Sequence, residues 1–148
     1  MPNWCFNRLR ISGPTDDVVQ FQQQAVGFSP WYHPEPHDEE DRLSFHNLVP
    51  IPSEILAAGF EPVGAAWERQ HWGCHGGAER SATTQEWHGG ALYEFDTAGS
   101  PPLNFLQAVS RSWPTLVFVL AYEERGNAYQ GLARAKAGAM ENYRVALV

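Results

Sequence analysis

The sequence predicts an α+β protein with a ferredoxin-like fold, in which a split βαβ arrangement forms an antiparallel sheet with two helices on one face. Three observations support this prediction. Residues 4–12 alternate apolar and polar side chains with the period of a strand. A helical pattern follows over 15–26, and a strand, helix and strand follow in that order over 92–122. A hairpin partner over 128–135 extends the sheet.

The first predicted strand, 4–12, carries Cys5, Leu9 and Ile11 on one face. Asn7 interrupts this apolar face. An amide inside a strand requires a hydrogen-bond partner, so Asn7 is either a structural link or part of a site.

The predicted helix 15–26 opens on a capping threonine and two acids, and Gly27 ends it. Residues 28–42 are rich in proline and acidic side chains, which predicts a surface loop. His33 and His37 are four residues apart there, but the prolines between them exclude the helical turn that would pair them as metal ligands.

Residues 43–49 are predicted to form the second strand, and about 50–90 an insertion into a single domain that spans 1–148. Within the insertion, 53–58 and 65–72 have helical patterns, and the glycine-rich remainder up to Gly90 is predicted to be a loop.

The third predicted strand is 92–97, and Ser100 caps the helix that follows. The apolar run 116–122 is typical of a central strand, and 128–135 returns beside it as a hairpin. Alternation near 143–148 suggests a further edge strand.

Right-handed crossovers place both helices on one face of this sheet and leave the other face bare. An apolar sheet face of this size needs an occupant. The insertion is expected to cover it, because it contributes Trp67, Trp72 and Trp87.

Ten basic and 17 acidic residues give the 148-residue chain a net charge of −7. This acidic balance disfavours nucleic-acid binding, since it offers no broad basic surface for phosphates. No segment has the length of an apolar membrane span, and the first residues lack a signal-peptide pattern, so we expect no membrane partner and a cytoplasmic location. The two cysteines are expected to stay reduced there.

Imidazole and thiolate groups crowd the segment around residue 74 and raise the alternative of a zinc site. Its ligands would be His71, Cys74, His75 and His88. Their spacing matches no usual ligand pair, so we predict no metal and no cofactor. A hydrolase with Cys74 as nucleophile and one of these histidines as base is a second alternative.

A third interpretation places the turn His71-Trp72-Gly73 against Asp96 and Ser100, where a strand ends and a helix begins. The N–H groups at a helix start can receive a carboxylate or an anion. This group, with Trp67 and Asn7, is predicted to be a structural hub or a ligand site.

Several blocks of the sequence resemble a known family. They are Met1–Asn7, Leu48–Pro52, Trp67–Gly73, Phe95–Pro102 and Tyr122–Gly126, with Gly131 beyond. Together they resemble the YubB-like or Api-type ferredoxin-like domains, a family of unknown function in proteins of bacteria, plasmids and phages. The resemblance spans nearly the whole chain, and it implies the fold that the periodicity predicts.

The chain departs from this family around residue 71. Relatives have Asn-Trp-Gly-Thr-Lys-Trp-Asp where this chain has His71-Trp72-Gly73-Cys74-His75-Gly76-Gly77. The tryptophan that precedes Ser-Pro-Pro in relatives is Gly99 here. An activity that depended on those side chains would be lost or replaced in this protein.

These observations favour a non-enzymatic accessory domain of the plasmid or phage type that binds another macromolecule, with a protein as the expected partner. One alternative is an enzyme that binds a small molecule or nucleotide between the insertion and the sheet. Its pocket would be lined by Trp67, His71, Trp72 and Asp96. Another is single-stranded nucleic-acid binding on the aromatic residues of the sheet.

Overall fold

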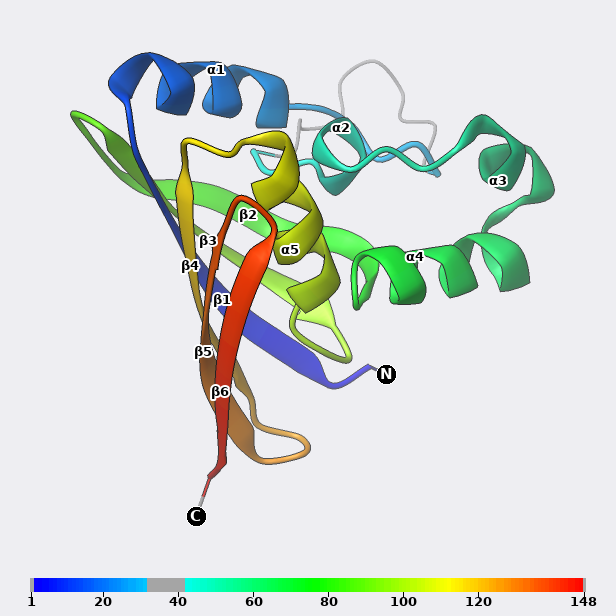
Figure 1. Ribbon diagram of the computed structural model, residues 1–148. Coiled ribbons are helices and arrows are strands. Elements are labelled where there is room, and N and C mark those ends of the chain that lie inside the picture. Colours follow the sequence, from blue (N-terminus) through cyan, green and yellow to red (C-terminus); the bar gives the residue numbers. More distant parts are fainter. Residues whose placement is uncertain (1, 32–41, 148) are drawn as a thin grey trace.

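The computed structural model describes residues 2–31 and 42–147. A six-stranded antiparallel sheet runs through the molecule in the order β2-β3-β1-β4-β5-β6 (Figure 1). The strands are β1 (Trp4–Ser12), β2 (His75–Trp87), β3 (Gly90–Ala98), β4 (Val117–Glu124), β5 (Tyr129–Lys136) and β6 (Ala139–Ala146). The helices are α1 (Thr15–Ala25), α2 (Phe45–Leu48), α3 (Ser53–Ala58), α4 (Ala65–His71) and α5 (Leu103–Ser112), with a kinked turn at Phe60–Gly64.

The order β1, α1, β2, β3, α5, β4 is the split βαβ plan, and its strands lie side by side as β2-β3-β1-β4. The ferredoxin-like α+β prediction is therefore confirmed. The hairpin strands β5 and β6 extend the sheet beyond β4, and α2 to α4 form an addition between α1 and β2.

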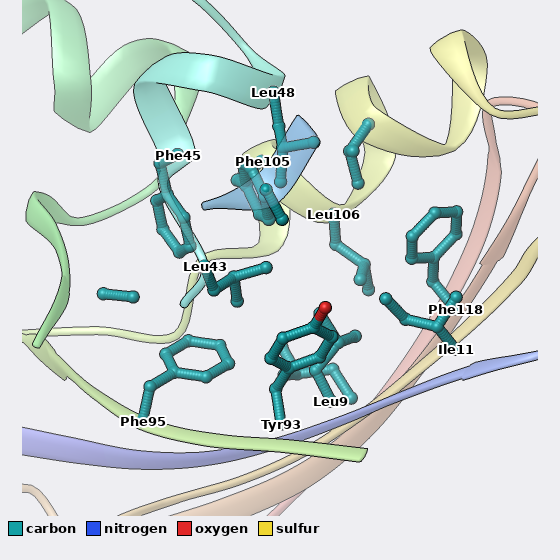
Figure 2. Packing of buried hydrophobic residues seen from close by; sticks show 14 of the residues in the cluster. Leu9, Ile11, Leu43, Phe45, Leu48, Tyr93, Phe95, Phe105, Leu106 and Phe118 are labelled. Carbon is teal, nitrogen blue, oxygen red and sulfur yellow. The ribbon is translucent and has the colours of Figure 1, made fainter. Parts of the chain in front are cut away.

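The main core lies between the sheet and the helices (Figure 2). Phe21 of α1 meets the rings of Tyr93 and Phe118 edge-on, with centroids 6.4 and 5.6 Å apart. Phe105 of α5 stacks on Phe45 of α2 at 3.8 Å between centroids. These aromatic contacts connect α1 to the central strands and α2 to α5. Burial of the apolar rings and their edge-on or stacked packing stabilise these contacts.

The prediction of a strand over 43–49 is wrong. Residues 45–48 form the helix α2, because the hydroxyl of Ser44 caps it by accepting the N–H of Asn47 at 3.2 Å. Phe45 and Leu48 both point into the core from this one helical turn. A short apolar run is compatible with a buried strand or a buried helix, so periodicity alone did not distinguish them.

The second strand is instead β2, where the sequence predicts a loop. Gly76 and Gly77 have positive φ angles of 82° and 74°, and the pairing of β2 with β3 shifts register three times. These irregularities remove the period of two by which a strand is recognised. The addition to the ferredoxin-like plan therefore precedes the second strand rather than following it.

The predicted covering of the second sheet face is also wrong. Helices α1 to α5 lie on one side of the sheet (Figure 1), where Trp72 and Phe45 meet edge-on and Phe45 meets Phe95 of β3. The opposite side, called the open face below, carries no helix of the described chain. Trp87 does lie there, at the end of β2, with the guanidinium of Arg10 4.8 Å from its ring.

Candidate functional site

Trp72 anchors the addition to α5. Its side chain is buried, and its indole N–H donates to the carbonyl of Val49 at 3.1 Å. Its own carbonyl accepts the N–H of Phe105, also at 3.1 Å. Because Trp72 contacts α2, the segment after it and α5 at once, its geometry is that of a packing residue.

The turn after α4 meets the start of α5. The carbonyl of Gly73 accepts a short hydrogen bond from the hydroxyl of Ser100. A side chain at residue 73 would stand 3.3 Å from the backbone of Pro101 and Leu103, and its φ of 85° suits glycine. The structure thus brings the predicted turn to Ser100. His71 stacks on Trp67 at 4.4 Å, and its Nδ1 donates to the Trp67 carbonyl at 2.9 Å, away from this contact.

Asp96 does not join this turn. Strand alternation turns its side chain to the open face, where it binds the guanidinium of Arg80 at 2.6 Å. The predicted group of His71, Trp72 and Asp96 is therefore split between the two faces, because the addition lies on the helix side. The space that remains beside Trp72 and the start of β2 has a volume of only about 20 Å³.

Asn7 links strands β1 and β3 inside the core. Its amide donates to the hydroxyl of Thr97 at 3.0 Å and to the carbonyl of Cys5 at 3.1 Å. Thr97 in turn donates to the carbonyl of Ser100 at 2.7 Å. Through this chain of hydrogen bonds, Asn7 and Ser100 fix the end of β3 to the approach of α5.

The four histidine and cysteine residues considered for zinc are not gathered. His75 begins the 13-residue strand β2 and His88 follows its last residue, where it contacts the hydroxyl of Thr15 at 3.2 Å. Across residues 2–31 and 42–147, no group of three potential metal ligands lies together. His33 and His37 lie outside the described residues.

Both cysteine thiols are buried in the core. Burial raises the pKa of the Cys5 thiol to about 12, and it raises that of Cys74 well above its ordinary value. A protonated, enclosed thiol is a poor nucleophile, so the arrangement does not suit Cys74 for hydrolysis.

We expect neither thiol to react with Ellman's reagent in the native protein at pH 8, and both to react fully after denaturation in urea. The physical reason is that only the exposed thiolate attacks a disulfide. Absorbance at the thionitrobenzoate band measures both. A thiol that titrates in the native state at the rate of free cysteine contradicts the burial described.

Glu68 is a buried, hydrogen-bonded acidic residue of the kind often found in functional sites, and the sequence alone did not indicate it. This carboxylate is fully buried on α4, and it accepts the N–H of Gly76 at 2.7 Å and the indole N–H of Trp31 at 3.0 Å. Burial raises its pKa, while the two hydrogen bonds oppose that shift. Its helical neighbours gave no signal, because a single glutamate on a short helix usually faces solvent.

The open face holds the other feature that the sequence did not reveal. Phe6, Leu132, Tyr143 and Val145 come from β1, β5 and β6, and we call them the apolar cluster. The pairing register sets them in two adjacent rows across the strands, where they line a hollow of about 410 Å³. Tyr143 is 69% exposed and Leu132 is 50% exposed.

Charged side chains surround the apolar cluster on the same face. Arg8 pairs with Glu94 at 3.4 Å, and Arg80 pairs with Asp96 on the neighbouring strand. Glu123, which lines the hollow, pairs with Arg125 at 3.1 Å. The rim therefore contains both signs of charge, and it produces no strongly positive field.

The fold and this face define a ferredoxin-like domain with one sheet face packed and one face open. Comparisons with known proteins agree with the fold. Residues 78–145, from β2 to β6, match the DUF1281_C family model, described as a ferredoxin-like domain in Api92-like protein. No curated protein matches the chain by sequence.

The crystal structure of a protein api92 from Yersinia pseudotuberculosis is similar to this chain, with a TM-score of 0.75. The similarity covers 97% of this chain and 98% of that chain, at 10% sequence identity. At this identity the comparison establishes a shared fold and nothing about activity. Both comparisons support the resemblance to Api-type domains that the sequence blocks indicate. No helix in the described residues is long and apolar enough to span a membrane.

Proposed function

We propose that this protein is a non-enzymatic accessory domain that binds another protein through the open face. The observation that carries the proposal is the apolar cluster, four large side chains that meet in a hollow on an uncovered sheet face. Folded proteins rarely leave such a patch in water unless it binds a partner. The resemblance to Api-type domains favours a plasmid or phage protein acting in the bacterial cytoplasm.

The composition of the face favours a protein partner. Protein interfaces combine an apolar, partly aromatic centre with a polar rim. Here Phe6 and Tyr143 supply aromatic groups, and the ion pairs of Arg8 and Arg80 form the rim. A partner that carries both signs of charge at its own rim would fit this arrangement.

The same face suits single-stranded nucleic acid poorly. Bases need aromatic platforms next to free cations that follow the phosphates. Leu132 and Val145 have no π surface, and Arg8 and Arg80 already bind carboxylates. The net charge of −7 adds repulsion for a polyanion.

The alternative of an enzyme with a small-molecule pocket between the addition and the sheet is disfavoured, because too little empty volume remains there. A volume of about 20 Å³ holds one water molecule, whereas ligand pockets measure roughly 300–1,000 Å³. The residues once expected to line that pocket point to two different faces of the sheet.

We expect Leu132→Asp to reduce retention of the protein partner at least tenfold in a quantitative pull-down, because a desolvated carboxylate in an interface is costly. The matched control is Val19→Asp. Val19 lies on α1 and is 44% exposed, close to the 50% of Leu132. Equal loss with both variants, or no loss with either, contradicts the proposal, provided that thermal unfolding shows both variants folded.

A further inference from the structure

Within residues 2–31 and 42–147, strand β6 forms a free edge of the sheet. It pairs with β5 on one side only, and all of its residues except Met140 are exposed. Its pairing with β5 has no register shift, and the strand contains neither proline nor an internal glycine. Proteins usually blunt such an edge with bulges, prolines or charged side chains, because it offers a template for another strand. Of these devices, β6 has only two charged residues of opposite sign, Glu141 and Arg144.

The hairpin turn determines which backbone groups of β6 face outward. Ala137 and Gly138 both have positive φ, 51° and 86°, so the turn between Lys136 and Ala139 is of type I′. Such a turn closes on a hydrogen-bonded pair, here Lys136 with Ala139. The odd-numbered residues of β6 therefore bond to β5, in agreement with the N–H of Leu147, which donates to Ala128 at 2.8 Å.

The backbone groups of the even-numbered residues then point away from the sheet. These residues are Met140, Asn142, Arg144 and Ala146. The opposite edge is different, because β2 has three register shifts, and the backbone N–H groups of Arg42 and Leu43 approach the hydroxyl of Ser81 there. Of the two sheet edges, β6 is thus the regular one.

We propose that two copies of this chain associate through β6, antiparallel, about a two-fold axis at Tyr143. We call the even-numbered residues of β6 outward-facing, because their backbone groups point away from the sheet. To form hydrogen bonds between the two copies, each outward-facing residue must lie opposite another outward-facing residue. Two even-numbered positions are always centred on a residue, so the axis passes through a residue and not between two residues. With the axis at Tyr143, Met140 lies opposite Ala146 and Asn142 opposite Arg144, so every outward-facing residue of β6 is paired. This proposal rests on the strand edge and does not depend on the open face as a protein-binding surface.

The side chains fit this register. Tyr143 lies opposite the partner's Tyr143 in a non-hydrogen-bonded pair, where side chains are closest and aromatic pairs stabilise a sheet. Glu141 lies opposite Val145, and Asn142 lies opposite Arg144, so no like charges meet directly. Moving the axis to Arg144 would set two guanidinium groups opposite each other, and moving it to Asn142 would leave Ala146 unpaired.

The association is closed. A two-fold axis uses the same edge of both copies, and it leaves only the two β2 edges at the ends of the enlarged sheet. Their bulges and their contact with the segment at Arg42 oppose further growth. The inference is therefore a discrete dimer with one continuous sheet.

Disulfide trapping tests the edge and the register together. In Tyr143→Cys, the two thiols would lie opposite each other with Cβ atoms about 4.5–5.5 Å apart, close to disulfide geometry. The native Cys5 and Cys74 are buried and contribute little background. Under mild oxidation of the full chain, we expect a disulfide-linked dimer from Tyr143→Cys at least fivefold above that from Ala82→Cys on β2 and Val145→Cys on β6.

Equal trapping of the three variants would mean random collision and would overturn the proposal. Sedimentation equilibrium of the unmodified chain supplies the second measurement. The expected result is a concentration-dependent mass that approaches twice that of one chain. A single-chain mass at all concentrations overturns the dimer, while the pull-down with Leu132→Asp still decides the protein-binding role separately.

Discussion

Replacing Phe105 by alanine is expected to lower the free energy of unfolding by about 4 kcal/mol, because large-to-small changes in a core lose burial and leave a cavity. Phe105 is buried, and its ring stacks on Phe45 at 3.8 Å with an interplanar angle of 10°. Figure 2 shows the two rings where the addition meets α5. The loss therefore acts on the joint between the addition and the ferredoxin-like core.

Urea unfolding followed by circular dichroism measures this effect. Phe105→Leu is the matched control, since it keeps most of the volume and is expected to cost about 1 kcal/mol. A loss below about 1 kcal/mol for Phe105→Ala would mean that the addition is not held by this stack.

Replacing Glu68 by alanine is expected to lower the free energy of unfolding by about 2–3 kcal/mol. The change leaves the N–H of Gly76 and the indole N–H of Trp31 without their acceptor inside the protein, and each unsatisfied donor costs about 1–3 kcal/mol. A water molecule that enters the enlarged space recovers part of the loss. Urea unfolding at pH 7 measures it, and a loss under 0.5 kcal/mol, on the order of a surface substitution, contradicts this role.

Glu68 also predicts a pH dependence. Its pKa is raised in the folded state, so the folded protein binds this proton more tightly than the unfolded chain does. The contribution of Glu68 to stability is then fully present below the ordinary glutamate pKa, and it decreases as the pH rises through the raised folded value. We expect the stability of the wild type relative to Glu68→Gln to fall over that window.

His46 acts in the opposite direction. Burial lowers its pKa, and its Nδ1 accepts the N–H of Ile51 at 3.0 Å in the neutral form. Its contribution is lost as the pH falls through the ordinary histidine pKa and the lowered folded value. The difference between the wild type and Glu68→Gln cancels this effect, so it isolates the carboxyl group. A difference that stays constant or grows with pH would contradict the raised pKa of Glu68.

Regular periodicity made most of the fold predictable. The alternation in β1, the helical pattern of α1 and the apolar run of β4 each gave an element close to the observed one. The predicted caps are wrong, because neither the hydroxyl of Thr15 nor that of Ser100 caps its helix. The second strand was misplaced for a physical reason. Ser44 starts a helix within an apolar run, and the glycines and bulges of β2 interrupt the alternation that marks a strand.

The site was less predictable than the fold, because it depends on which face each side chain takes. Strand alternation turns Asp96 to the face away from Phe95, but the addition packs on the other side. The apolar cluster joins residues more than a hundred positions apart, from Phe6 to Val145, so no local pattern contains it. Glu68 was missed because its hydrogen-bond partner Trp31 is distant in sequence.

The central claim is that the open face binds a protein, and site-specific photo-crosslinking in cells tests it most directly. A benzophenone amino acid at residue 132 would sit in the apolar cluster, and one at residue 19 on α1 serves as the control. We predict an adduct of this chain with a second, different protein from position 132 and none from position 19. No adduct from position 132, or the same adducts from both positions, would contradict the claim.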